Sequence, residues 1–143
     1  MPNISSALQD TVPESHLHVA RRVGTTCADL GVAAFLVGGS VRDSLMGAPC
    51  GDLDIAVEFP QADFVSSIAE ALGGQVVMSS QFSTARIWVS GVEFDIVMAR
   101  SENYLEPGAL PTVAPGPITD DLARRDFSIN AMAVELSPTS WGE

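Results

Sequence analysis

The sequence predicts an α+β domain whose mixed, mostly antiparallel sheet is flanked by helices. Two observations support this fold class: helix-like and strand-like segments alternate through the first half of the chain, and strand-like segments then follow one another. The length of 143 residues fits one domain. A hydrophobic content of 46% is enough for a core and argues against global disorder.

The first element expected is a helix that begins at Pro13, because proline favours the first turn of a helix. Apolar residues then recur at three- and four-residue steps until Gly31, which supplies a stop signal. Residues 1–12 are expected to be a flexible lead-in, and residues 13–143 to form the domain itself.

A buried strand is expected over residues 33–37, where the chain is continuously apolar. It ends at Gly38 and Gly39, and Ser40 is expected to cap the short helix that follows.

A second strand is expected over residues 52–58, where polar and apolar residues alternate. Asp52 and Asp54 therefore project from one face of this strand. A helix is expected between Pro60 and Gly73, because apolar residues recur there at four-residue steps.

Three more strands are expected over residues 75–79, 84–89 and 92–99. The last two are joined by Ser90-Gly91, a two-residue turn typical of a hairpin. In the last strand Asp95 lies on the face opposite the apolar set.

Residues 101–118 contain four of the nine prolines and are expected to form a long irregular loop. Thr119 is expected to cap a helix that follows, and a final apolar run covers residues 132–136.

The charge balance limits the partners of this segment. Its 18 acidic and 7 basic residues give a formal net charge of −11, which argues against binding of DNA or RNA by this segment alone. The acidic balance is still compatible with a site that binds phosphates through metal ions.

The location is expected to be cytoplasmic. Cys27 and Cys50 have no zinc-type spacing and fit a reducing compartment. The first residues lack the features of a signal peptide, and no apolar run could span a membrane.

Two short motifs could act on a nucleotide. Gly38, Gly39 and Ser40 lie between a strand and a helix, where backbone N–H groups can hold phosphates, although many such turns hold no ligand. Asp52 and Asp54 could bind hard cations together, or could simply be charged residues on the wet face of an edge strand.

A third carboxylate favours the catalytic interpretation. Asp95 has the same outward phase as Asp52 and Asp54, and three carboxylates beside a phosphate loop fit two-metal phosphoryl transfer with Mg²⁺. Asp52 and Asp54 would hold both ions, and Asp95 would complete the site of the ion that activates the attacking hydroxyl.

Three arginines could neutralise phosphate charge: Arg42, Arg124 and Arg125. The alternative for each arginine is an ion pair, for instance with Asp43, Asp126 or Glu58. Asn130 could contact the nucleotide or act as a local cap.

Four motifs occur in order: Gly-Gly-Ser-Val-Arg-Asp (38–43), Asp-Leu-Asp (52–54), Phe-Asp-Ile-Val-Met-Ala-Arg (94–100) and Arg-Arg-Asp-Phe-Ser-Ile-Asn-Ala (124–131). Together they resemble the head domain of class II CCA-adding enzymes and bacterial poly(A) polymerases, in the DNA polymerase beta superfamily. The resemblance covers about residues 14 to 136. It implies metal-dependent transfer of AMP or CMP from ATP or CTP to an RNA 3′ end, either tRNA CCA addition or polyadenylation. It also implies a mixed five-stranded sheet flanked by helices.

The resemblance also implies roles for single residues. Asp52 and Asp54 correspond to the metal-binding pair and Asp95 to the third carboxylate. The turn at Gly38, Gly39 and Ser40 corresponds to the triphosphate site. The stretch that begins at Arg124, Arg125 and Asp126 lies beside the nucleotide in the family.

Family members continue from the head into helical domains that select the base and grip the RNA, and these are missing from the sequence. The chain is therefore expected to be truncated before the helical neck, to reach tRNA only through absent domains, and to be weak or inactive alone. The alternatives are a non-catalytic nucleotide-binding or interaction module, or one half of a split enzyme. A small nucleotidyltransferase that modifies proteins is a third possibility, against which the Arg-Arg-Asp-Phe motif argues. No membrane or DNA partner is expected, and the head alone does not separate CCA addition from polyadenylation.

Overall fold

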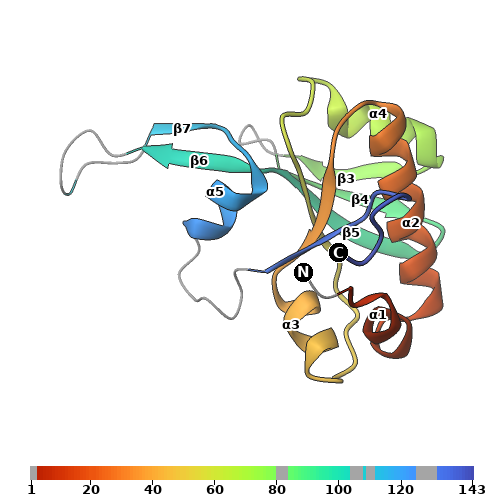
Figure 1. The fold of residues 1–143 in the computed structure, drawn as a ribbon. Coiled ribbons are helices and arrows are strands. Elements are labelled where there is room, and N and C mark those ends of the chain that lie inside the picture. Colours follow the sequence, from red (N-terminus) through yellow and green to blue (C-terminus); the bar gives the residue numbers. More distant parts are fainter. Residues whose placement is uncertain (1–2, 80–83, 104–107, 109–111, 125–131) are drawn as a thin grey trace.

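The computed structural model describes residues 3–79, 84–103, 108, 112–124 and 132–143. A six-stranded sheet forms its centre, in the spatial order β3-β4-β5-β2-β1-β8 (Figure 1). In chain order its strands are β1 (Ala34–Val37), β2 (Asp54–Val57), β3 (Gln75–Ser79), β4 (Thr84–Val89), β5 (Val92–Met98) and β8 (Ala133–Glu135). Within this sheet β2 and β5 pair in parallel and the other neighbours pair antiparallel. The α+β class with a mixed, mostly antiparallel sheet is confirmed, with six strands in place of the five that the resemblance implies.

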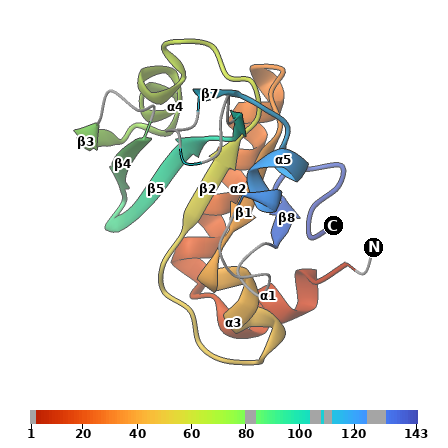
Figure 2. The same cartoon turned by 90° about the vertical axis from the view of Figure 1, so that its left-hand side faces the viewer.

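Helices α2 and α4 cover one face of this sheet. The helices within the described residues are α1 (Ser5–Thr11), α2 (Glu14–Asp29), α3 (Gly39–Leu45), α4 (Phe64–Leu72) and α5 (Ile118–Ala123). The long helix α2 packs with α4 over the sheet, and α5 lies on the other side of the molecule (Figures 1 and 2).

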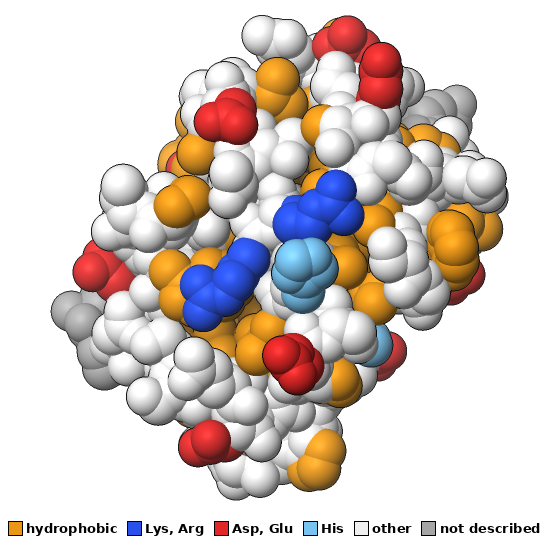
Figure 3. Space-filling view, turned by 90° about the vertical axis from the view of Figure 1, so that its right-hand side faces the viewer, with side chains coloured by type: hydrophobic (Ala, Val, Ile, Leu, Met, Phe, Trp, Pro, Cys, Tyr) orange, Lys and Arg blue, Asp and Glu red, His pale blue; other side chains and the backbone are white. Residues whose placement is uncertain are grey.

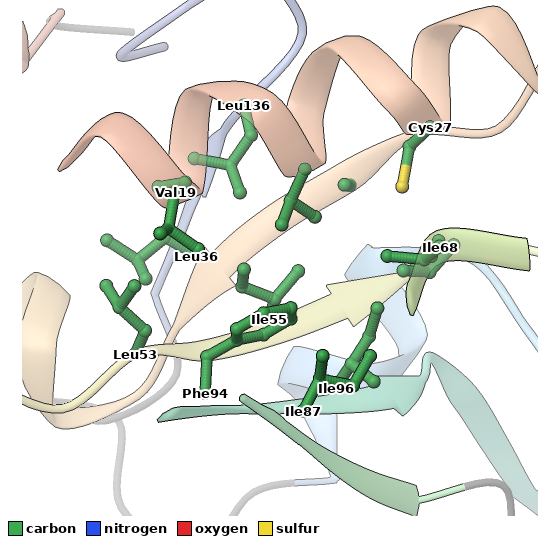
Figure 4. Close-up of a cluster of buried hydrophobic side chains, with 14 of the residues drawn as sticks. Val19, Cys27, Leu36, Leu53, Ile55, Ile68, Ile87, Phe94, Ile96 and Leu136 are labelled. Carbon is green, nitrogen blue, oxygen red and sulfur yellow. The ribbon is translucent and has the colours of Figure 1, made fainter. Parts of the chain in front are cut away.

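The core lies between α2 and the sheet (Figure 4). Val19 and Cys27 of α2 face Leu36 of β1 and Ile55 of β2, and all four side chains are buried. Phe94 and Ile96 of β5 extend the same layer. Because the core covers one face of the sheet, the polar side chains of the strands lie on the opposite face.

Residues 5–11 are part of the packed domain, although residues 1–12 were expected to be a flexible lead-in. Leu8 in α1 and Val12 after it are 1% and 5% exposed, and their four-residue spacing puts both on one side of the chain. The Thr11 hydroxyl donates to Ser44 Oγ at 2.9 Å, which ties α1 to α3.

Two predicted caps are wrong. Ser40 lies inside α3, and its hydroxyl points back to the Val37 carbonyl at 3.4 Å, while Gly38 occupies the N-cap position. Helix α5 begins after Pro117 instead of being capped by Thr119. Gly38, with a positive φ, precedes α3, and Pro117, whose ring fixes φ, precedes α5. The backbone conformation of these two residues decides where each helix begins.

The stretch predicted as a loop contains two strands. β6 (Arg100–Asn103) and β7 (Thr112–Pro115) form a separate antiparallel pair, which projects beside α5 (Figure 1). The prolines lowered the expectation of strands here, but Pro115 is the last residue of β7 and so does not interrupt it.

Other boundaries differ by a few residues. Strand β2 begins at Asp54 and not at Asp52, and α4 begins at Phe64 and not at Pro60. Gly73 ends α4 in the left-handed conformation, as expected.

The α2 side of the molecule carries basic groups (Figure 3). His18, Arg21 and Arg22 line a shallow depression there. Arg21 stacks over the Trp141 ring at 4.1 Å, and Arg22 Nη2 donates to the Leu72 carbonyl at 3.0 Å, so both arginines tie segments to α2. No helix in the described part of the chain is long and apolar enough to cross a membrane.

Candidate active site

The parallel pairing of β2 and β5 brings two predicted carboxylates together. Asp54 and Asp95 are direct Cα partners in this pairing, and neighbouring strands in a sheet are about 4.8 Å apart. The next pair, Ile55 and Ile96, is fully buried on the opposite face. Asp54 and Asp95 therefore share the face away from the core, as their alternation with apolar neighbours predicts.

A polar cavity of about 390 Å³ opens on this face. All three predicted carboxylates, Asp52, Asp54 and Asp95, line it together with Glu93 and Arg86. Four carboxylates thus face one guanidinium, which leaves a formal excess of three negative charges. The cavity lies within the size range of small-molecule sites.

The glycine turn lies directly against this cavity. Gly38 has a φ of 79°, which favours glycine, and a Cβ placed on it would come 3.6 Å from Asp54 Oδ2. The turn leads into α3, and the first N–H groups of a helix have no partner within the helix. Backbone donors and carboxylates therefore meet at one place.

Arg42 folds back over the same turn. Its Nε donates to Asp43 Oδ1 at 3.0 Å, which is the ion pair considered as the alternative to phosphate contact. A Cβ placed on Gly39 would come 3.2 Å from Arg42 Nη2. Glycine at this position therefore leaves room for the guanidinium beside the turn.

Arg86 on β4 was not predicted as a site residue. It is the Cα partner of Asp95 across the hairpin, and its Nε donates to Asp95 Oδ1 at 2.9 Å and its Nη2 to Oδ2 at 3.4 Å. The Asp95 carboxylate, followed by Glu93 and Asp54, raises the pKa of Arg86 above its ordinary value. The sequence alone could have predicted this contact, because counting outward from the Ser90-Gly91 turn places Arg86 opposite Asp95.

Arg124 is held by a buried carboxylate. It lies at the end of α5, and its Nε and Nη2 donate to Asp121 Oδ1 at 3.2 and 2.9 Å. Asp121 is completely buried and also accepts the backbone N–H of Arg100 at 3.1 Å. Asp121 was not among the ion-pair partners named as examples for the arginines, which were Asp43, Asp126 and Glu58.

Glu58 instead fixes the start of α5. Its Oε2 accepts the backbone N–H of Ile118 at 2.7 Å, so the residue after β2 satisfies the first turn of this helix. Arg42 and Arg124 do not line the carboxylate cavity as far as the described residues go. Arg125, Asp126 and Asn130 lie outside the described residues.

The donor types in the cavity suit Mg²⁺, which prefers carboxylate oxygens. In the described part of the chain, however, no three Asp, Glu, His or Cys side chains converge closely enough to form a ready-made metal site. Asp95 is turned to Arg86, so a three-carboxylate ligand set requires that this carboxylate be released.

Paired carboxylates on an open sheet face, beside a glycine turn, define a candidate domain for phosphoryl or nucleotidyl transfer. The chain belongs to the Poly A polymerase head domain family, whose model matches residues 34–141.

Two relatives are tRNA nucleotidyltransferases. The chain is 47% identical to the A-adding tRNA nucleotidyltransferase of Halalkalibacterium halodurans, over 99% of this chain and 33% of the relative. It is 43% identical to the CC-adding tRNA nucleotidyltransferase of Deinococcus radiodurans, over 71% of this chain and 27% of that enzyme. The chain therefore spans about one third of the length of the first relative.

Solved structures share the fold. A CCA-adding enzyme in an apo form has a TM-score of 0.89 at 35% identity, and the match covers 99% of this chain and 34% of that one. The Thermotoga maritima CCA-adding enzyme complexed with tRNA has a TM-score of 0.79 at 33% identity, over 99% and 31% of the two chains. A CCA-adding enzyme complexed with CTP has a TM-score of 0.77 at 33% identity, over 99% and 32%. These matches confirm the predicted fold and family.

Proposed function

We propose that this chain is the catalytic head of an enzyme that transfers AMP or CMP from ATP or CTP to the 3′ end of tRNA. The parallel pairing of Asp54 with Asp95, with Gly38 against Asp54, carries the proposal. The carboxylates of one cavity next to a glycine turn support this proposal, as do relatives that match nearly the whole chain and are tRNA nucleotidyltransferases.

Asp52, Asp54 and Asp95 are the proposed metal ligands. Two Mg²⁺ ions bound there would supply an activated 3′ hydroxyl and charge neutralisation for the departing pyrophosphate. The carboxylates themselves fix the position of the metal charge, and the excess of negative charge in the cavity favours divalent cations.

The remaining predicted residues are proposed to hold the nucleotide. The backbone N–H groups at Gly38, Gly39 and Ser40 face the triphosphate, because they begin α3 next to Asp54. Three arginines are proposed to neutralise phosphate charge: Arg42, Arg124 and Arg125. Asp126 and Asn130 are proposed to lie beside the nucleotide.

The choice of nucleotide and the grip on RNA are proposed to depend on further helical segments. The formal charge of −11 leaves this segment poorly suited to hold an RNA backbone unaided. Relatives include both an A-adding and a CC-adding enzyme, so the head itself is compatible with either nucleotide. We expect the enzyme to act in the cytoplasm, where two free buried cysteines stay reduced.

Calorimetric titration with ATP and with CTP, each in the presence and absence of Mg²⁺, tests the nucleotide site. Wild-type protein should bind in a Mg²⁺-dependent manner, and the double variant Asp52→Asn/Asp54→Asn should lose that binding. Glu70→Gln, an exposed acidic position on α4, is the matched control and should bind as the wild type does. Nucleotide binding that ignores both Mg²⁺ and the double substitution would contradict the proposed site.

Extension of a tRNA lacking its 3′ end, with the helical segments of a relative supplied separately, tests the transfer itself. The proposal predicts that the added segments raise activity above that of the head alone. Nucleotide binding with no extension under either condition would favour a non-catalytic binding module.

A further inference from the structure

We propose that Arg86 is a built-in counter-ion of Asp95, which a divalent cation must displace before the three-carboxylate site can form. The inference rests on the proposed function, because it assumes that metal enters the cavity of Asp52, Asp54 and Asp95. It adds a positioning residue that controls how readily the third carboxylate becomes a ligand.

The geometry of the pair supports this role. Arg86 contacts both oxygens of Asp95, at 2.9 Å from Nε and 3.4 Å from Nη2. The contact is set by the β4–β5 register, in which Arg86 and Asp95 are direct partners in the hairpin closed by the turn at Ser90-Gly91. The strand register therefore holds Arg86 opposite Asp95. A cation that binds Asp95 must compete with the guanidinium for its carboxylate oxygens.

The charge of the surroundings explains why a counter-ion is present. Asp54 lies beside Asp95 on the parallel neighbour β2, and Glu93 is two residues away on the same face of β5. Like charges on adjacent strands destabilise a sheet. Arg86 is the one cation among the described residues of the cavity lining, so it offsets this repulsion while no metal is bound.

The exposure of the pair explains why the exchange is possible. The side chains of Arg86 and Asp95 are 42% and 36% exposed, and ion pairs of this kind contribute little net free energy. A long arginine side chain at this exposure can rotate into solvent without opening the core. A divalent cation brings twice the charge, and it gains ligands from the neighbouring carboxylates as well.

The absence of a ready-made metal site among the described residues fits the same picture. Asp52, Asp54 and Asp95 line one cavity, yet no three such side chains converge while Asp95 is held by Arg86. Release of Asp95 from Arg86 would free a third carboxylate for this set.

The test is the affinity for Mn²⁺ in the absence of nucleotide, measured by electron paramagnetic resonance of free Mn²⁺ and by calorimetry. Arg86→Gln should bind Mn²⁺ about two- to fivefold more tightly than wild type, the range measured for breaking an exposed ion pair. Arg86→Lys, which keeps the charge but not the two-point contact, should fall between them. Arg22→Gln, on the α2 side away from the cavity, is the control for net charge and should leave the affinity unchanged.

A double-variant cycle shows whether Arg86 acts through Asp95. In an Asp95→Asn background, adding Arg86→Gln should no longer tighten Mn²⁺ binding, because the contact is already lost. In wild-type protein, the Nε–H resonance of Arg86 should shift on titration with Mg²⁺ as the contact with Asp95 breaks.

The outcomes separate this inference from the proposed function. Wild-type Mn²⁺ binding that depends on Asp54, with equal or weaker binding by Arg86→Gln, overturns the role of Arg86 and leaves the metal site in place. Tighter binding that persists in the Asp95→Asn background also overturns it, since the effect would then be that of a distant charge. Failure of wild type and Arg86→Gln to bind Mn²⁺ at all contradicts both. Circular dichroism spectra of all variants verify that each is folded.

Discussion

Replacing Asp121 by asparagine should destabilise the protein, because this fully buried carboxylate connects two segments. It accepts hydrogen bonds from the Arg100 backbone N–H and from Nε and Nη2 of Arg124. Asparagine keeps the shape and one acceptor oxygen but removes the charge. Hydrogen bonds to charged groups contribute about 1.5–3 kcal/mol and neutral ones about 0.5–1.5 kcal/mol. We therefore expect Asp121→Asn to lower the free energy of unfolding by about 1–3 kcal/mol.

Urea unfolding followed by circular dichroism measures this change, with the m-value as a test that the transition keeps its cooperativity. Asp120→Asn is the matched control, because the neighbouring carboxylate is exposed and accepts only the Ser101 hydroxyl, at 2.8 Å, among its described contacts. It should change the stability by less than about 0.5 kcal/mol. Equal losses for the two variants would show that burial and pairing of Asp121 do not stabilise α5 and β6.

Three other changes test separate parts of the structure. Gly24→Ala should lower the stability by about 1–3 kcal/mol in urea unfolding, because a Cβ there would clash with the backbone carbonyl oxygen of Leu136. Thr25→Ala, on the exposed side of α2, should be nearly neutral. Burial is the main cause that raises the pKa of Glu135, and the charges of Glu143 and Glu58 add to it. The folded protein therefore binds a proton at Glu135 more tightly than the unfolded chain does. The stability should fall as the pH rises through and above the ordinary glutamate range. Glu135→Gln should therefore be more stable than wild type at pH 7 and equal to it near pH 3, and the same difference at both values would contradict this assignment. Gly38→Ala should weaken nucleotide binding in calorimetry, because its φ of 79° strains any side chain beside the carboxylates, and unchanged affinity would argue against the turn as a phosphate site.

The carboxylate face could be predicted because it follows from local periodicity. Alternation alone puts Asp54 and Asp95 on outward faces of their strands, and the structure agrees. That β2 and β5 are parallel neighbours depends on the topology of the whole sheet, which a single strand pattern does not contain. Arg86 is an intermediate case, because the hairpin turn fixes its register and only the significance of that register was missed.

The elements that were missed depend on contacts far away in the sequence. Helix α1 is only seven residues long, and it is held by burial of Leu8 and by a bond from Thr11 to Ser44. β6 and β7 pair across a proline-rich stretch whose local propensity opposes strands. Asp121 resembles any acid in the first turn of a helix until its burial is known. Local patterns do not encode such tertiary contacts.

We propose above that Asp52, Asp54 and Asp95 form the metal site that receives the nucleotide. Anomalous scattering from a crystal of this protein soaked with Mn²⁺ and a non-hydrolysable CTP analogue tests it most directly. We expect a manganese peak within coordination distance of the Asp54 carboxylate, with Asp95 turned away from Arg86 toward the metal. A bound nucleotide whose manganese lies elsewhere, with the pair of Arg86 and Asp95 intact, would contradict it.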